Sequence, residues 1–368
     1  MAGGRRFEDL RPAALTRLGG FARVEMLLEA SRAQRYTSPA KMVRLAELAV
    51  CELRRLAGRS YGSEPLADLR ALAWAELGNS HRVADNLPAA SSCLAHAVRS
   101  ARRGTGSDWV TARLADLTAS LWADQGRFAD AIEALERLAI LYRELGDTHL
   151  AGRALISRGI FLGHDNQHRR AIVSLTTGLS LVDVEREPGL QLSAMHDLVS
   201  MLVFIGQYRE ARLLLWQVQH LHHRDGSPLN LVRLQWLWGR VYSGLENFAR
   251  AEKELYAARA GMADAGKPYH QALVSLDLAE VYVRQGRRPE ARALASEMLV
   301  TFRRLGIARE IIAVLLLTRE RCMDPHVGAE ALCLCFREVA VLVAELDRVP
   351  TRRRRGAKSG SYPPALFV

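Results

Sequence analysis

The sequence predicts an all-α fold, an α-solenoid of about eight antiparallel helical hairpins. The main observation is an alanine that returns at a fixed interval, as Ala90, Ala131, Ala171, Ala211, Ala251, Ala291 and Ala331. The first step is 41 residues and the next five are 40 residues each. A period of this length is typical of repeat proteins, in which each unit packs on its neighbours. In addition, strand signals are scarce, while the helix formers Ala, Leu, Arg and Glu dominate.

The bulk composition is that of a soluble folded protein. Of 368 residues, 49% are hydrophobic and 25% are charged. The longest apolar runs, such as 311–317, are too short to cross a bilayer, and no apolar run follows Arg5 and Arg6 as a secretory signal would. Five cysteines, an odd number, favour a reducing compartment. We therefore expect a cytoplasmic protein without a membrane span.

The positive charge is concentrated at the two ends of the chain. The net charge is +11, of which residues 348–368 contribute +6 and residues 1–23 contribute +3, leaving +2 for the body. The folded body is therefore not expected to be a general polyanion binder. The tail contains Arg352, Arg353, Arg354 and Arg355. This run could contact nucleic acid, an acidic partner or an anionic membrane, or it could simply keep the protein soluble.

The N-terminal region, residues 1–65, is expected to be a loose lead-in followed by an atypical helical hairpin. Residues 21–34 have apolar side chains at helical spacing. The pair Ser38-Pro39 predicts the start of the next helix, because Ser can cap a helix and Pro suits its first turn. That helix is expected to end near Leu56.

Regular repeats are predicted from residue 66 to residue 306. In the first of them, Trp74, Leu77, Gly78 and His81 are followed by Ala90, Leu94 and Ala97. This spacing resembles the tetratricopeptide repeat (TPR), whose pattern is W-x2-L-G-x2-Y and then A-x3-F. His81 stands where the family has Tyr, and Leu94 where it has Phe. The resemblance covers roughly residues 66–346 and is closest to bacterial TPR arrays with long helices.

The turns follow the same period. Gly126, Gly206 and Gly286 are expected to end the first helix of a hairpin with positive φ. A second set lies between hairpins, at Gly146, Gly226, Gly266 and Gly306. Since the TPR unit has 34 residues, we assign the extra residues of each unit to a longer second helix. Residues 183–190 are expected to form a longer loop.

The C-terminal end departs from the regular pattern. Residues 307–346 are expected to form a capping hairpin, because Arg319 stands where a small residue is expected. After Asp347 the apolar periodicity stops, so residues 347–368 are expected to be a basic, disordered tail.

The TPR resemblance implies a right-handed superhelix whose first helices line a concave groove that binds a protein or peptide. Transfer of that geometry by register places eight residues in the groove: Asn79, Arg82, Arg113, Arg153, His196, Arg233, Trp236 and Arg240. Guanidinium groups bind carboxylates in a bidentate manner, so an acidic peptide or a chain carboxylate would suit this surface. The alternative is that these are solvated arginines of an Arg-rich protein. The family's two-carboxylate clamp is not expected, because only Asn79 fits it, while Ala75, Leu117 and Ser157 do not.

Metal binding and catalysis are not expected. His220, His222 and His223 crowd a helix end, but only two of them could share a face, and zinc needs three or four ligands. Cys322 and Cys335 fall on packing positions, so we expect them in the core. The motifs G-x-S-x-G, H-E-x-x-H and G-x-G-x-x-G do not occur in the sequence. We therefore expect a protein that is not an enzyme and needs no cofactor.

The sequence thus favours a non-enzymatic scaffold that binds a protein or peptide in its groove. The alternative is a regulatory or sensor module of a bacterial transcription or signalling system, with nucleic acid contacted through the basic termini or through a partner. Residues 1–65 contain no convincing helix-turn-helix, which disfavours direct sequence-specific DNA binding. The pattern leaves the partner's identity and the oligomeric state open.

Overall fold

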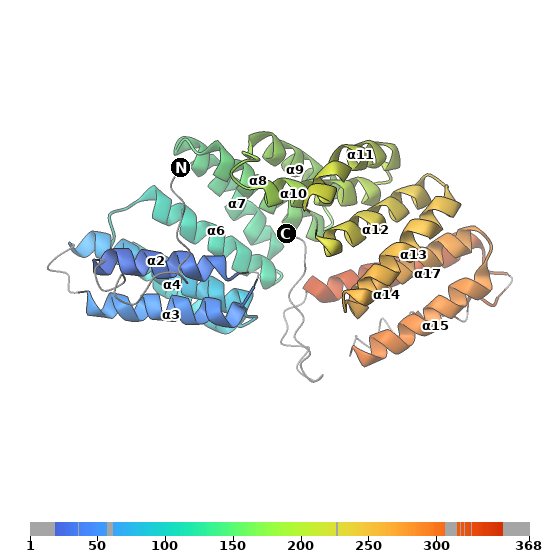
Figure 1. Cartoon of the computed structure of the whole chain (residues 1–368), viewed down its shortest axis with the longest axis horizontal. Helices are drawn as coiled ribbons and strands as arrows, with labels where there is room; N and C mark the ends of the chain where they lie inside the picture. The colour runs from blue at the N-terminus through green and yellow to red at the C-terminus, as the bar shows by residue number, and fades with distance from the viewer. Residues whose placement is uncertain are drawn as a thin grey trace. The chain divides into compact units, whose positions relative to one another are not determined.

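The structure, a computed structural model, describes residues 19–35, 37–56, 62–225, 227–305, 315–316, 318–319, 321–324 and 326–348. The described residues form helices joined by short turns, which confirms the all-α prediction (Figure 1). The chain divides into two compact units, Met1–Leu155 and Ile156–Val368. The expected lead-in, Gly226, Gly306 and the arginine run Arg352–Arg355 lie outside the described residues.

Unit 1 consists of helical hairpins in chain order. Its helices are α2 (Gly20–Ala33), α3 (Pro39–Arg55), α4 (Ser63–Val83), α5 (Leu87–Ala101), α6 (Asp108–Asp124) and α7 (Phe128–Glu144). The next helix, α8 (Thr148–His164), begins in this unit and ends in the second. Helices α2 and α3, α4 and α5, and α6 and α7 pack against each other as pairs. The predicted start signal is confirmed, because the side chain of Ser38 accepts a hydrogen bond from the backbone N–H of Lys41 at 3.3 Å.

Unit 2 continues the same arrangement. After the end of α8 it contains α9 (His168–Leu181), α10 (Pro188–Phe204), α11 (Tyr208–Asp225), α12 (Pro228–Gly244), α13 (Phe248–Asp264), α14 (Pro268–Arg284), α15 (Arg288–Arg304) and α17 (Ala329–Arg348). The loop expected at 183–190 is shorter than predicted, because Pro188 occupies the first turn of α10, where a missing N–H costs no hydrogen bond. None of the described helices is both long enough and apolar enough to cross a membrane.

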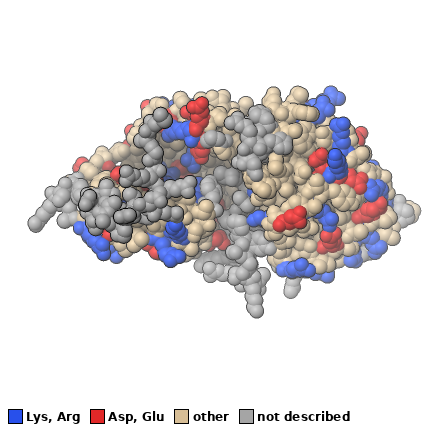
Figure 2. All heavy atoms as spheres, viewed as in Figure 1, with Lys and Arg blue, Asp and Glu red and all other residues tan. Residues whose placement is uncertain are grey.

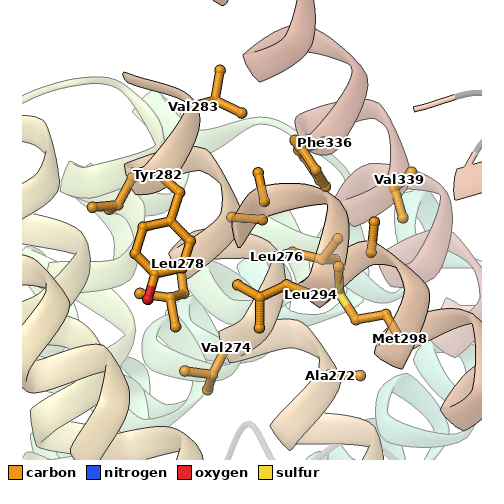
Figure 3. Close-up of a cluster of buried hydrophobic side chains, with 14 of the residues drawn as sticks. Ala272, Val274, Leu276, Leu278, Tyr282, Val283, Leu294, Met298, Phe336 and Val339 are labelled. Atoms are coloured by element: carbon orange, nitrogen blue, oxygen red, sulfur yellow. The ribbon is translucent and has the colours of Figure 1, made fainter. Parts of the chain in front are cut away.

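The core of unit 2 is largest around α14. Leu276, Leu278 and Tyr282 of this helix belong to one cluster of buried side chains with Leu294 of α15 and Phe336 of α17 (Figure 3). All five side chains are buried. A helix that is apolar around most of its circumference is packed on several sides, and α14 contacts α13, α15 and α17.

Two cysteines of the C-terminal region belong to this buried interior. Cys322 is 2% exposed and Cys335 is 7% exposed. The prediction that they are small hydrophobic core residues is therefore confirmed.

The turn inside each hairpin from α4–α5 to α14–α15 contains one residue with positive φ at the same place in the repeat. Gly126, Gly206 and Gly286 have φ of 77°, 77° and 76°, as the sequence predicts. The equivalent positions in the intervening hairpins have φ near 60° as well, although they carry Asp85, Asn166 and Glu246. Asp and Asn tolerate the left-handed region better than most residues, which accounts for two of these three.

These turns give a direct stability prediction. We expect Gly286→Ala to lower the free energy of unfolding by about 1 kcal/mol, because Ala pays a cost at positive φ that glycine does not. An added Cβ there would meet no atom within 4 Å, so the effect would come from the backbone alone. The measurement is the denaturant midpoint of the purified chain.

Gly189→Ala in α10 is the matched control. Its added Cβ also meets nothing within 4 Å, but Gly189 does not have a positive φ. We expect that variant to be neutral or slightly stabilising. Equal effects of the two substitutions would contradict the backbone explanation.

Candidate functional site

The candidate site is the surface that the first helices of the hairpins make within each unit, called here the first-helix face of that unit. It is formed by α4, α6 and the start of α8 in unit 1 and, separately, by α10, α12 and α14 in unit 2. Neighbouring first helices contact each other directly, α4 with α6 and α10 with α12. On the molecular surface in Figure 2, basic and acidic side chains of the described residues are interspersed. Several of the arginines predicted from register have carboxylate neighbours.

On this face in unit 1, the predicted residues Asn79 and Arg82 bind each other, and Arg82 also binds Asp124. Asn79 is only 3% exposed, and its Oδ1 accepts hydrogen bonds from Nε and Nη2 of Arg82, at 3.2 and 3.0 Å. The Nη1 of Arg82 donates to Asp124 Oδ2 at 2.7 Å, and the Arg82 side chain is 11% exposed. Both residues therefore join α4 to α6 rather than present free polar groups to a ligand.

A buried carboxylate lies beside them. Glu76 is 1% exposed, and one of its oxygens accepts a hydrogen bond from Nη2 of Arg113 at 3.2 Å. The Nη1 of Arg113 is also 3.3 Å from Asp116 Oδ2, so this guanidinium is held by two carboxylates. Nη1 of Arg32 lies 4.0 Å from the same oxygen of Glu76. A charge at this depth requires such partners, because an unpaired buried carboxylate is costly.

Arg113 and Arg153, which share a register in consecutive hairpins, meet at a pocket within unit 1. Its cavity volume is about 160 Å³. The pocket is lined by Trp109, Arg113, Asp116, Tyr142, Leu150, Arg153 and Ala154. The lining therefore combines two guanidinium groups and one carboxylate with two aromatic rings and two aliphatic side chains.

The aromatic wall of this pocket is formed by Trp109 and Tyr142. Their ring centroids are 6.2 Å apart, with an angle of 46° between the planes. The pKa of Tyr142 is raised to about 12, mainly by burial and also by the charge of Asp116, against the opposing effect of Arg113 and Arg153. The phenol therefore keeps its proton at neutral pH and can act as a hydrogen-bond donor.

In unit 2, two predicted residues are held by one carboxylate. The indole Nε1 of Trp236 donates to Asp277 Oδ2 at 2.6 Å, and Nε of Arg240 lies 3.8 Å from the same oxygen. Arg240 also lies over the ring of Phe204, 4.8 Å from its centroid. Phe204 in turn stacks on His168, with centroids 4.8 Å apart and an interplanar angle of 8°. These contacts link α10, α12 and α14.

Arg233 faces a second buried carboxylate in unit 2. Asp197 is 3% exposed, and its Oδ2 accepts no hydrogen bond from any described residue. Burial raises the pKa of Asp197 to about 7, against the opposing effect of Arg233. Burial also lowers the pKa of Arg233, whose Nη1 donates to Asn230 Oδ1 at 3.3 Å. His196, the remaining predicted residue, precedes Asp197 on α10 and is half-buried.

The pairs Glu76–Arg113 and Asp197–Arg233 occupy equivalent positions in two different repeats. Glu76 and Asp197 occupy one register, three periods apart, and Arg113 and Arg233 occupy another, also three periods apart. Asp277 follows Asp197 by two periods. The arginines were predicted from register, whereas the acidic partners were missed. The signal that could have found them is this recurrence of acidic residues at a packing position.

The predicted residues thus form local clusters rather than one row of cations. Asn79 and Arg82 come together, as do Arg113 and Arg153, and as do Trp236 and Arg240. His220, His222 and His223 belong to α11, but their side chains are outside the described part of the structure.

No protein-family model matches the sequence, and no curated protein matches it. Solved structures do match in fold. The apo form of the quorum sensor NprR from B. thuringiensis has a TM-score of 0.64 at 13% identity, covering 90% of this chain and 96% of that chain. NprR has also been solved in complex with its cognate peptide NprX.

Two further similar structures belong to proteins of other kinds, an ATPase with a repeat sensor and a phosphatase. A STAND-type signal transduction ATPase with a tetratricopeptide repeat sensor, from Pyrococcus horikoshii, has a TM-score of 0.61 at 10% identity, covering 94% of this chain and 52% of that chain. Aspartyl phosphate phosphatase F from Bacillus subtilis has a TM-score of 0.57 at 14% identity, covering 81% and 77%. Likeness at this level of identity establishes the fold alone. The chain therefore has the helical repeat fold of TPR-type proteins, as its sequence pattern predicts.

Proposed function

We propose that the chain is a non-enzymatic scaffold that binds a protein or peptide on its first-helix face. The observation that carries this proposal is the pocket at which Arg113 and Arg153 meet two aromatic rings. Side chains of this kind are enriched in binding surfaces, because aromatic residues and arginine supply both apolar area and directional hydrogen bonds. The fold supports the proposal, since NprR, which it resembles, binds its cognate peptide NprX.

The first-helix face carries both positive and negative charges, which limits how acidic its ligand can be. Arg82, Arg113 and Arg240 already have carboxylate neighbours in the fold. A strongly acidic partner would gain less from them than from an uncompensated row of cations. The scaffold is therefore suited to a ligand with few negative charges and with apolar side chains, rather than to a polyanion.

A regulatory role is the second candidate. Two of the similar structures are a quorum sensor and a signal transduction ATPase with a TPR sensor. In that role the bound peptide or protein would be the signal, and the scaffold would pass it to another component. Aspartyl phosphate phosphatase F shows that a similar fold also occurs in a protein named as an enzyme, so phosphatase activity is worth assaying alongside binding.

The proposal is tested by affinity capture from a nuclease-treated native lysate. The baits are the full chain, Arg153→Glu, Trp236→Ala and the control Arg137→Glu. Arg137 is a suitable control because its side chain is 69% exposed on α7 and does not line the pocket. We expect a protein or peptide that is retained by the full chain and the control, and is reduced at least about tenfold by Arg153→Glu.

Two results would contradict the proposal. One is a set of captured proteins and peptides that is the same for all four baits. The other is an untreated sample in which the retained material is nucleic acid and its retention falls steeply with added salt. The basic tail, Arg352–Arg355, would then be the candidate binding surface for nucleic acid.

A further inference from the structure

The second helices of the hairpins in unit 2 carry a stripe of residues that does not belong to the first-helix face. On α9, α11, α13 and α15 this stripe starts at Arg169, Arg209, Ala249 and Pro289, respectively. It continues four, seven and eleven residues further along each helix, a spacing that keeps side chains on one side of a helix. Its described members are exposed, apart from the half-buried Ser296, so the stripe faces outward. These positions are called here the unit 2 stripe.

The unit 2 stripe carries positive charge without a compensating negative charge. In its described part it has three basic residues and no acidic one; the basic residues are Arg169, Arg209 and Lys253. None of the three forms an ion pair with another described residue. Glu210 follows Arg209 in the sequence, but consecutive residues point about 100° apart on a helix, so it lies at the side of the stripe. The three cations are therefore available to acidic groups of a partner.

Two aromatic side chains stand at the same place of the stripe in consecutive hairpins, Trp216 on α11 and Tyr256 on α13. Trp216 is 63% exposed and Tyr256 is 47% exposed. Each is held by a buried ring of the first helix that follows it. The indole of Trp216 meets that of Trp238 edge to face, with centroids 5.9 Å apart, and the hydroxyl of Tyr256 lies 2.5 Å from that of Tyr282. The exposed rings are thus fixed before a partner binds, which lowers the entropy lost on binding.

Aliphatic side chains extend this apolar surface. Leu213 lies one turn before Trp216, Val173 takes the position of Leu213 on α9, and Val300 lies on α15; all three are exposed. Single exposed apolar residues are ordinary on a protein surface. Here, however, they share one stripe with fixed aromatic rings and with arginines, while acidic residues are absent. This composition is typical of the centre of a protein–protein interface.

The same composition disfavours three other occupants. A second copy of the chain bound through the same stripe would bring the basic residues of both copies together, and like charges repel. Nucleic acid would gain little from the aliphatic side chains, which have no flat ring on which bases can stack. A helix that lies on a membrane needs a continuous apolar face, whereas Thr176, Ser180 and Ser296 interrupt this one.

We propose that the unit 2 stripe is a docking surface for a second protein, whose contacting segment is apolar and carries acidic side chains beside its apolar ones. Trp216 and Tyr256 supply the main apolar contact. Arg169, Arg209 and Lys253 pair with the acidic side chains. The stripe and the first-helix face are formed by different helices, so this surface is additional to the one in the proposed function.

The probe is a display library of random peptides of about 16 residues, long enough for four helical turns. The library is selected on the full-length chain, and the affinity of each retained clone is then measured for the chain and for Trp216→Ala and Arg209→Glu. The matched controls lie on α7 of unit 1, where Glu133 and Glu136 occupy the equivalent stripe. They are Ile140→Ala, an exposed apolar residue of that stripe, and Arg137→Glu, an exposed arginine.

We expect clones that contain more Asp and Glu than the starting library, together with at least two large apolar residues. Their affinity should fall about 10- to 100-fold with Trp216→Ala. Arg209→Glu should weaken them about three- to tenfold, more strongly at low salt, and should bind better those derivatives whose acids are replaced by Lys. The two controls should bind like the unmodified chain. If Trp216→Ala fails to fold because its contact with Trp238 is lost, Arg209→Glu still decides, since Arg209 makes no ion pair in the described structure.

The contrary results are distinct. If no retained clone depends on Trp216 or Arg209, the docking inference fails; clones that depend on Arg153 instead would belong to the first-helix face and support the proposed function alone. Stripe-dependent clones without an excess of acidic residues would overturn the acidic partner. Binding of single-stranded DNA or of phosphatidylserine vesicles that is lost with Arg209→Glu, without any stripe-dependent peptide, would assign the stripe to nucleic acid or to a membrane. Self-association that is lost with Trp216→Ala would assign it to a second copy. Both of these outcomes would overturn the partner protein.

Discussion

Replacing Asp197 with asparagine should stabilise the protein at pH 8 and leave its stability nearly unchanged at pH 4. Asp197 is 3% exposed, and one of its oxygens has no hydrogen-bond donor among the described residues. Its charge is therefore poorly compensated, even with Arg233 nearby. Asparagine has almost the same shape as the protonated acid but never acquires the charge, so it removes that cost.

The direction follows from proton binding in the two states. Burial raises the pKa of Asp197 from 3.8 to about 7 in the folded protein. Between these values the folded state binds more protons than the unfolded state, so the free energy of unfolding falls as the pH rises. The full cost, about 4 kcal/mol from the size of the shift, is present above pH 7 and absent below pH 4.

The measurement is the denaturant midpoint of the chain and of Asp197→Asn at several pH values from 4 to 8. The difference between the two should grow with pH over this range and then level off. Glu246→Gln serves as a control, because that side chain is 74% exposed in its contact with Arg284. A stabilisation by Asp197→Asn that is the same at every pH would contradict the assignment of a raised pKa.

Asp197 also illustrates which part of the site a sequence pattern can reveal. The period predicts which arginines lie on the first-helix face, because their positions follow from the register of the small residues. It does not reveal Glu76, Asp197 or Asp277, since a packing position in a helical repeat is expected to be apolar. Their role depends on arginines that lie in a neighbouring hairpin, about 36 residues away in the sequence and adjacent only in the folded chain.

The fold itself could be predicted more fully, for a physical reason. Each repeat contacts mainly its neighbours, so a local pattern of small and large residues determines most of the packing. Gly126, Gly206 and Gly286 could be placed in turns because positive φ favours glycine. Glu246 could not be placed there from its chemistry, because it has no intrinsic preference for that conformation, and only its register indicates the turn.

Gly239→Ala should lower the free energy of unfolding by about 2–3 kcal/mol, although alanine is the better helix former. Gly239 lies on α12 opposite Leu255 of α13. A Cβ at this position would be 2.6 Å from Leu255 Cγ and 3.3 Å from the backbone nitrogen of Leu255. Leu255 is fully buried, so its side chain has no open space into which to move, and the two helices would have to separate.

A double-mutant cycle measures this contact directly. Leu255→Ala alone should cost about 2–5 kcal/mol through the cavity that it leaves. In the double variant the new Cβ at position 239 meets no leucine, so the combined loss should be smaller than the sum of the two by at least about 1 kcal/mol. Additive effects would show that Gly239 is not needed for close packing.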